Sequence, residues 1–279
     1  MNPLVTPAWL AARLQDPSTV ILDATLPPVG VTPPVDTHAR YLTQHLPGAV
    51  FFDIDALSDH ASPYPHMLPT PESFAASMSA LGISDTATIV VYEQEGVFSA
   101  PRARWMLRTL GAPHVYLLDG GLHAWTQAKL PTESGPVQRT PATFKATLNP
   151  EAVKDLTQLK QKIATHQQIL DARSAARFQG TAPEPRPGLS SGHMPGATSV
   201  PFLELVEDGR LKPIEQLRNL FASKAVDLQK PITTTCGSGV TAAVVALGLE
   251  LAGANQISLY DGSWAEYAAQ PDAVIEKTT

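Results

Sequence analysis

The sequence predicts an α/β protein that consists of two tandem domains of the same fold, each a mostly parallel sheet flanked by helices. Three observations lead to this prediction. The chain has 279 residues, and a typical domain contains roughly 150 residues. One series of short motifs occurs twice along the chain, and in each half apolar runs that suit strands alternate with helical patterns.

The internal duplication is the main evidence that the two domains are alike. Residues 21–24 (Ile-Leu-Asp-Ala) recur at 169–172, and residues 45–49 (His-Leu-Pro-Gly-Ala) recur with one change at 193–197. Both pairs of motifs are separated by 148 positions. This spacing indicates that a whole domain is repeated, because the repeat units of solenoid proteins have only about 20–50 residues.

The duplication also sets the predicted boundaries. We predict one domain at residues 1–135, a linker at 136–150 and a second domain at 151–279. The linker prediction depends on a polar, proline-containing stretch, which is typical of a connection between domains.

Strands and helices are predicted in the same order in both halves. In the first half, the β-branched run at 88–92 predicts a buried strand, a helical pattern follows at 100–110 before Gly111, and residues 114–118 suit a second strand.

The second half is expected to have a strand at 231–235, a loop at 236–239, a helix from 240 to about 251 and a strand at 256–260. Strand–helix–strand order predicts parallel pairing with helices on the faces of the sheet.

Composition and charge exclude several classes of protein. The formal net charge is −6, whereas a nucleic-acid-binding protein needs a basic surface. No apolar run approaches the roughly 18 residues of a membrane span, and the first residues do not resemble a secretory signal. The single cysteine excludes an internal disulfide and a cysteine-rich zinc site. We therefore expect a soluble, cytoplasmic protein without a metal or an organic cofactor.

Cys236 is the main candidate for a catalytic residue. It follows a predicted strand and begins a loop with glycines at 237 and 239, directly before a predicted helix. Ligands of open α/β sheets bind at the carboxyl ends of the strands. The glycines let backbone N–H groups point inward and the helix adds its positive end, so the loop favours a thiolate. A lone cysteine is more often a small buried side chain, but this context favours a nucleophile.

Two cysteine chemistries use such a loop. Cysteine-dependent phosphatases place an arginine six positions after the nucleophile to bind phosphate, and Ala242 occupies that position here. Sulfur transfer through a persulfide needs no such arginine, because the loop N–H groups stabilise the negatively charged outer sulfur. The sequence therefore favours sulfur transfer.

Two tandem α/β domains with one cysteine, in the second domain, resemble the rhodanese superfamily of sulfurtransferases over nearly the whole chain. The loop is similar to that of the 3-mercaptopyruvate sulfurtransferases, whereas thiosulfate-specific members typically have Cys-Arg-Lys-Gly-Val-Thr. Two cations beside the sulfur suit the compact thiosulfate dianion, and a neutral loop suits a donor whose carboxylate lies away from its sulfur. The resemblance implies 3-mercaptopyruvate as donor, a persulfide on Cys236, and contacts from the loop residues Gly237, Gly239, Val240 and Thr241.

The segment at residues 171–186 also resembles the family pattern. In the 3-mercaptopyruvate enzymes, an Arg before Phe and an Arg after Glu-Pro bind the carboxylate and keto oxygen of the donor, and these positions are Arg177 and Arg186 here. A planar guanidinium suits this role because it can bind two oxygens at once. We expect Arg173 instead to pair with a neighbouring carboxylate and hold the loop.

The resemblance further implies a proton relay of Ser238, His66 and Asp55. In such a relay the carboxylate orients the imidazole, and the imidazole assists proton transfer at the hydroxyl. Pro65 stands where relatives often have Asp, which alters the surroundings of His66. The alternative is a histidine that serves only in packing.

The first half has no thiol at the position that matches Cys236, which lies near Glu93, so we expect this domain to be catalytically silent. The implied sulfur acceptor is thioredoxin, a small thiol or cyanide, and the implied product is pyruvate. Two other functions stay open at this point: a thiosulfate:cyanide sulfurtransferase, and a non-catalytic carrier that passes a persulfide to a partner.

Overall fold

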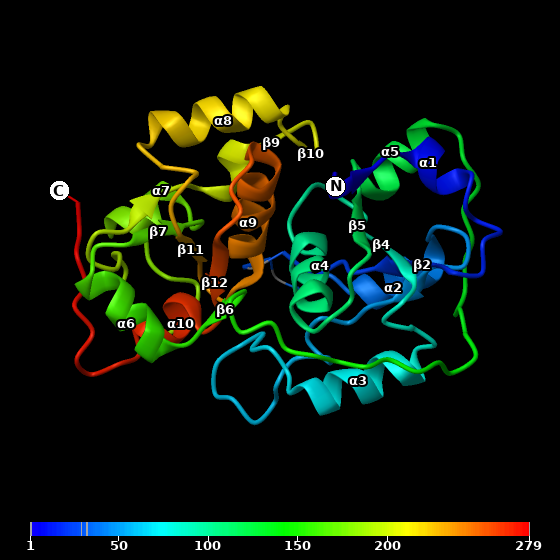
Figure 1. Cartoon of the computed structure of the whole chain (residues 1–279), viewed down its shortest axis with the longest axis horizontal. Coiled ribbons are helices and arrows are strands. Elements are labelled where there is room, and N and C mark those ends of the chain that lie inside the picture. Colours follow the sequence, from blue (N-terminus) through cyan, green and yellow to red (C-terminus); the bar gives the residue numbers. More distant parts are fainter. Residues whose placement is uncertain (1, 29, 32, 279) are drawn as a thin grey trace. The chain divides into compact units, whose positions relative to one another are not determined.

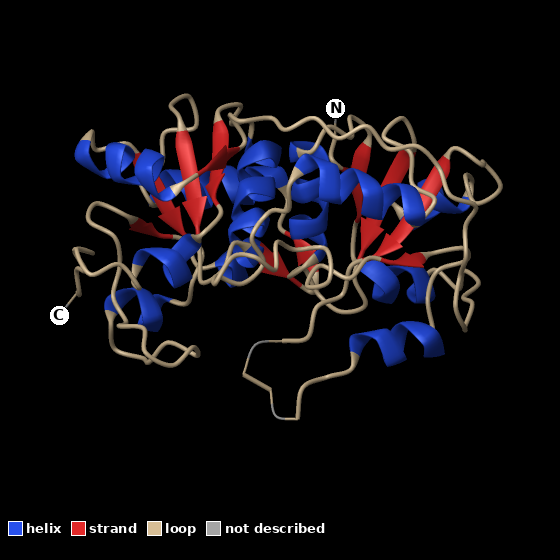
Figure 2. Cartoon of the chain, turned by 90° about the horizontal axis from the view of Figure 1, so that it is seen from below, coloured by secondary structure: helices blue, strands red, loops and turns tan. Residues whose placement is uncertain are grey.

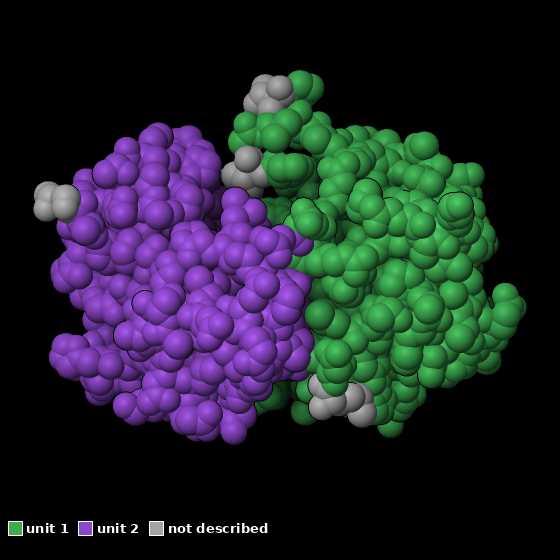
Figure 3. Space-filling model, turned by 90° about the horizontal axis from the view of Figure 1, so that it is seen from above, with its two compact units in different colours: residues 1–59, 68–149, 208–210 green, residues 60–67, 150–207, 211–279 purple. Residues whose placement is uncertain are grey.

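Residues 2–28, 30–31 and 33–278 are described by a computed structural model, in which the chain forms two compact units (Figure 3). Each unit contains one five-stranded parallel sheet flanked by helices (Figure 2). The predicted fold class, two α/β domains of one architecture, is confirmed. Unit 1 comprises Met1–Asp59, Leu68–Asn149 and Asp208–Arg210, and unit 2 comprises His60–Met67, Pro150–Glu207 and Leu211–Thr279.

The strands of unit 1 are β1 (Leu4–Val5), β2 (Thr19–Asp23), β3 (Val50–Phe51), β4 (Thr88–Tyr92) and β5 (Val115–Leu118). Their order across the sheet is β1-β5-β4-β2-β3, and every neighbouring pair is parallel. Four of the five residues of the central strand β4 are buried. A strand covered on both faces needs apolar side chains at nearly every position, which explains the continuous apolar run in the sequence.

The helices of unit 1 are α1 (Pro7–Ala11), α2 (Thr37–Thr43), α3 (Pro71–Ala80), α4 (Ala100–Thr109) and α5 (Gly121–Gln127). Helix α4 packs on β4 and β5 (Figure 1). Leu10 of α1 and Trp125 of α5 are fully buried and pack with Val90 and Tyr92 of β4. The core of this unit therefore forms around β4.

The sheet of unit 2 repeats this arrangement. Its strands are β6 (Val153–Lys154), β7 (Gln168–Asp171), β8 (Thr198–Ser199), β11 (Ile232–Thr235) and β12 (Ile257–Tyr260). Their order is β6-β12-β11-β7-β8, which matches unit 1 strand for strand, and all pairs are parallel. The short strands β9 (Val206–Glu207) and β10 (Arg210–Leu211) form a separate two-stranded sheet.

The helices of the second half are α6 (Leu156–Ala164), α7 (Ala175–Gln179), the 3-10 helix η1 (Phe202–Leu205), α8 (Ile214–Ser223), α9 (Val240–Ala252) and α10 (Ser263–Tyr267). Helix α9 packs on β11, β12 and α8 (Figure 1). It is apolar on almost every side because it is buried on almost every side. Among the described helices, none is long and apolar enough to cross a membrane.

The strands and helices predicted in the two halves occur with ends within one residue of those expected. The predicted linker residues up to 149 run along unit 1. Phe144 is buried edge-on against Phe74, and the N–H of Ala142 donates to the carbonyl of Ser79. This segment thus adds to the packing of unit 1, although its sequence is polar.

Candidate active site

Cys236 lies at the carboxyl end of β11, the central strand of unit 2. The loop ends at Gly239, whose φ of +80° is in the left-handed region that favours glycine. Val240 and Thr241 form the start of α9. The cysteine is 2% exposed, and Gly237 beside it is partly exposed. The loop thus places the thiol where a parallel α/β sheet ordinarily binds its ligand.

Several N–H groups of this loop are available to an anion. Those of Gly237, Ser238 and Val240 have no acceptor in the part of the chain that the structure describes. The N–H of Cys236 itself donates to Ser263 Oγ at 3.3 Å. The loop therefore has the donors that a persulfide anion needs.

Helix α10 holds the loop by two of the loop's backbone carbonyls. The N–H of Trp264 donates to the carbonyl of Cys236 at 2.9 Å, and the N–H of Ala265 donates to the carbonyl of Gly237 at 3.0 Å. With two carbonyls fixed, the peptide planes of the loop have a defined orientation.

Two guanidinium groups lie beside Gly237, as the resemblance implies. A Cβ atom at this glycine would lie 3.0 Å from Arg177 Nη2 and 3.6 Å from Arg186 Nη1. A side chain at position 237 would therefore meet the guanidinium of Arg177, which would have to shift by a few tenths of an ångström. Segment 175–186 supplies the positive charge that the neutral loop lacks.

Arg173 has the structural role expected from the sequence. Its side chain is fully buried and forms ion pairs with Asp171 at 2.6 Å and Glu184 at 2.7 Å. Burial alone would lower the pKa of Arg173, but the two carboxylates outweigh burial and raise it. Its guanidinium also stacks over the ring of Trp264 at 4.0 Å. Arg173 thus connects the end of β7, the loop at 184 and α10.

Glu184 is a site residue that the sequence analysis missed. Its side chain is 2% exposed and accepts hydrogen bonds from Arg173 and from Nε and Nη2 of Arg177. Arg177 is therefore oriented by a carboxylate, and only part of its donor set is left for a substrate. The one sequence signal was the acidic residue of the Glu-Pro pair that precedes Arg186.

The predicted contact between Ser238 and His66 is present. Nδ1 of His66 lies 2.9 Å from Ser238 Oγ, and both residues belong to unit 2. The backbone of His66 has a φ of 60°, which is uncommon for a residue other than glycine. A histidine that contacts the loop hydroxyl in this way can exchange a proton with it.

Asp55, the third member of the predicted relay, is exposed and belongs to unit 1. Its place in the relay stays a prediction.

The register of the two sheets identifies the partner of Cys236 in the silent half. Tyr92 pairs with Asp23 in unit 1, and Thr235 pairs with Asp171 in unit 2. Because residues 21–24 and 169–172 are the duplicated motif, the next residue along the central strand is Glu93 in one unit and Cys236 in the other.

Glu93 fills its own loop. The carboxylate is 3% exposed and accepts hydrogen bonds from the N–H groups of Phe98, Ser99 and Ala100 and from the hydroxyl of Ser99. Burial raises the pKa of Glu93 to about 6, against the opposing effect of these N–H donors. The loop N–H groups that could bind an anion in unit 1 are thus already bonded to the carboxylate of Glu93.

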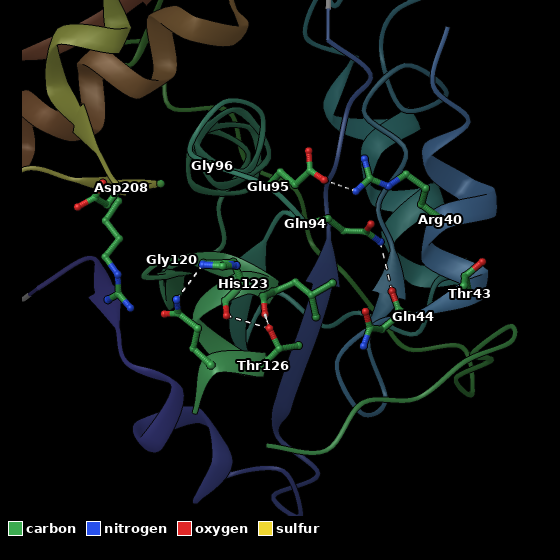
Figure 4. A pocket seen from close by; sticks show the side chains of 14 residues that line it. Arg40, Thr43, Gln44, Gln94, Glu95, Gly96, Gly120, His123, Thr126 and Asp208 are labelled. Carbon is green, nitrogen blue, oxygen red and sulfur yellow. Dashed lines mark hydrogen bonds and ion pairs between the residues drawn. The ribbon is translucent and has the colours of Figure 1, made fainter. Parts of the chain in front are cut away.

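A pocket of about 970 Å³ in unit 1 contains none of the predicted site residues. Figure 4 shows its polar lining, in which Arg40 and Glu95 form an ion pair and His123 contacts Gln127. It has no thiol, so sulfur chemistry is not possible there by the same route. The loop of unit 2 therefore stays the candidate active site.

Comparison with known proteins gives the class that this architecture defines: the chain belongs to the rhodanese family, whose rhodanese-like domain matches residues 6–128 and 155–270. The resemblance seen in the sequence is confirmed. The chain is 47% identical to the 3-mercaptopyruvate sulfurtransferase of Escherichia coli (strain K12) over 271 residues, which cover 96% of this chain and 95% of that protein.

Two further comparisons extend this result. The thiosulfate sulfurtransferase of Bos taurus is 41% identical over 273 residues, with coverage of 95% of this chain and 91% of that protein. The crystal structure of SseA from Escherichia coli, presented as a 3-mercaptopyruvate sulfotransferase, superposes with a TM-score of 0.87 and 44% identity, covering 95% of this chain and 99% of that one. Overall identity thus indicates sulfur transfer, and the choice of donor depends on the site.

Proposed function

We propose that the chain is a 3-mercaptopyruvate sulfurtransferase, which moves sulfur through a persulfide on Cys236 to a thiol or cyanide acceptor and releases pyruvate. The observation that carries this proposal is the position of two arginines beside a neutral cysteine loop. The high identity to an enzyme of that name supports it.

The donor is bound by its α-keto carboxylate. Arg177 and Arg186 approach Gly237, one residue after the thiol, so a carboxylate held by them leaves the sulfur of a three-carbon donor near Cys236. Bidentate contacts from guanidinium groups fix the orientation as well as the position of the donor.

In the first step, the thiolate of Cys236 attacks the donor sulfur. A sulfur–sulfur bond forms and the carbon–sulfur bond breaks, with its electron pair left on the carbon as the enolate of pyruvate. A proton then reaches that carbon, and the proton of the donor thiol is lost from the persulfide, so the charges balance. Ser238 and His66, which are in contact, are the groups that we assign to this proton transfer.

In the second step, an acceptor nucleophile attacks the outer sulfur and restores the thiolate. Until then the persulfide anion is stabilised by the free N–H groups of Gly237, Ser238 and Val240. Thioredoxin, a small thiol and cyanide are the acceptors we propose, because each offers a nucleophile small or exposed enough to reach the loop.

Thiosulfate is the alternative donor, and the structure of the loop argues against it. Relatives specific for thiosulfate typically have Arg at position 237, where a side chain would begin 3.0 Å from Arg177 in this chain. The positive charge thus lies to one side of the loop, where it suits a remote carboxylate better than a compact dianion. A non-catalytic carrier would not need the arginine pair.

The test is a comparison of donors at equal concentration with the wild-type chain and Cys236→Ser. We expect faster turnover of 3-mercaptopyruvate than of thiosulfate and no transfer by the variant, since a hydroxyl forms no persulfide. Faster turnover of thiosulfate would contradict the proposed donor. Activity retained in Cys236→Ser would contradict the proposed site.

A further inference from the structure

Ser263 combines burial with an unfavourable backbone. It is the first residue of α10, its side chain is fully buried, and its φ is +50°. A residue with a Cβ rarely adopts this conformation, and such outliers persist where the surrounding structure holds them in place. The hydroxyl makes two contacts: it donates to the carbonyl of Tyr260 at 3.0 Å and accepts from the N–H of Cys236 at 3.3 Å.

The silent unit shows what the fold requires at this position without a catalytic cysteine. The equivalent of Ser263 is Gly121, three residues after the end of β5, with a φ of +54°. The next residue makes the same backbone hydrogen bond in both units. The N–H of Leu122 donates to the backbone carbonyl of Glu93, and the N–H of Trp264 donates to the backbone carbonyl of Cys236. The fold thus accepts glycine at this turn, and the unit with the thiol has serine despite the backbone conformation.

We propose that Ser263 is a positioning residue for sulfur transfer, which fixes the peptide of Cys236 through the N–H and so directs the thiol into the cradle formed by the next residues of the loop. This inference depends on the proposed function of Cys236. The N–H of Cys236 is removed from the set that binds the anion, and the N–H groups of Gly237, Ser238 and Val240 are left to do so. The side chain of Ser263 is fully buried and acts through the backbone of Cys236, so it does not need to touch the donor.

The informative substitution is Ser263→Gly. It removes the hydroxyl and introduces glycine, which favours this backbone conformation and which unit 1 has at the equivalent turn. The melting temperature separates loss of activity from misfolding. We expect kcat to fall by roughly 10- to 100-fold, because small displacements of a reacting group have effects of this size, with donor KM changed by less than about twofold. The melting temperature should stay within about 3 °C of wild type.

A spectroscopic measurement tests the contact without any substrate. The chain has one cysteine, so labelling with ¹⁵N-cysteine gives a single amide resonance, that of Cys236. We expect its exchange with solvent to accelerate by at least roughly tenfold in Ser263→Gly, as expected when a protecting hydrogen bond is lost.

Ser258→Ala is the matched control. Ser258 is a buried serine of β12 whose hydroxyl contacts Thr233 at 3.0 Å, away from the loop. This variant should lower stability but leave kcat and the Cys236 amide unchanged. A kcat in Ser263→Gly within about threefold of wild type would overturn the proposed role, because the loss of a positioning contact is measured by the ratio of wild-type to variant kcat. If the wild-type chain does not use 3-mercaptopyruvate, the proposed function fails instead, and the amide signal still decides whether Ser263 holds Cys236.

Discussion

Arg177 and Arg186 both lie beside Gly237, and Glu184 orients Arg177. Arg177 shares two of its nitrogens, Nε and Nη2, with the carboxylate of Glu184. The role of Arg177 and Arg186 in donor binding stays a prediction. The sequence could not show that Glu184 orients Arg177, because that pairing depends on three-dimensional contacts.

We expect Arg186→Lys to raise the donor KM by about tenfold, equivalent to roughly 1.4 kcal/mol, because lysine cannot form the bidentate contact. Steady-state kinetics with 3-mercaptopyruvate measure this change. Arg218→Lys, at a half-exposed arginine of α8 paired with Glu215, is the control and should leave KM unchanged. An unaltered KM in Arg186→Lys would remove this residue from donor binding.

Glu184 is the carboxylate that orients Arg173 and Arg177. We expect Glu184→Gln to lower the free energy of unfolding by about 2–3 kcal/mol. This is less than the roughly 3–5 kcal/mol for a buried charge left unpaired, because Arg173 still has its ion pair with Asp171. Urea denaturation provides the measurement.

For comparison, Glu215→Gln removes a carboxylate that is 78% exposed in its ion pair with Arg218 and should change stability by less than about 0.5 kcal/mol. Equal effects of Glu184→Gln and Glu215→Gln would show that Glu184 is not the buried anchor of the arginines.

At the scale of elements, each half has one loop between the central strand and the following helix, and the two loops have different anions. In unit 2 the loop with the unpaired N–H groups carries the thiol of Cys236. In unit 1 the carboxylate of Glu93 accepts hydrogen bonds from the loop N–H groups. The sequence located this position near Glu93 but could not show that the side chain turns back into its own loop.

The buried carboxylate makes the stability of unit 1 depend on pH. The pKa of Glu93 is raised from 4.5 to about 6 in the folded chain, so the folded state binds the proton more tightly than the unfolded state. This contribution is fully present below pH 4.5 and is lost as the pH rises through 6, a change of about 2 kcal/mol.

Urea denaturation of the wild type and Glu93→Gln at pH 4.5 and pH 7.5 isolates this group. We expect the free energy of unfolding of the wild type to fall by about 2 kcal/mol more than that of the variant over this interval. The same fall in both proteins would exclude Glu93 as the titrating group.

At the scale of the whole chain, the duplicated framework could be read from the sequence, because local patterns determine it. Strand β4 and helix α9 have strong apolar patterns, and their ends lie within one residue of the predictions. Two features could not be predicted. Residues 60–67 group with unit 2 although they lie in the first half of the sequence, and Ser263 carries a strained conformation that no sequence pattern reveals.

A covalent intermediate has a kinetic consequence for the whole reaction. Because pyruvate leaves before the acceptor binds, we expect ping-pong kinetics, with parallel lines in double-reciprocal plots at several fixed acceptor concentrations. Initial rates with 3-mercaptopyruvate and a small thiol or cyanide provide the data. Intersecting lines would indicate that both substrates bind before sulfur moves.

The central claim is that Cys236 receives sulfur directly from 3-mercaptopyruvate, and intact-protein mass spectrometry without an acceptor tests it most directly. We expect the donor to add the mass of one sulfur atom to the wild-type chain, located at Cys236 by peptide analysis, with about one equivalent of pyruvate released. Unchanged mass together with continued pyruvate release, or a sulfur atom added equally to Cys236→Ser, would contradict the account.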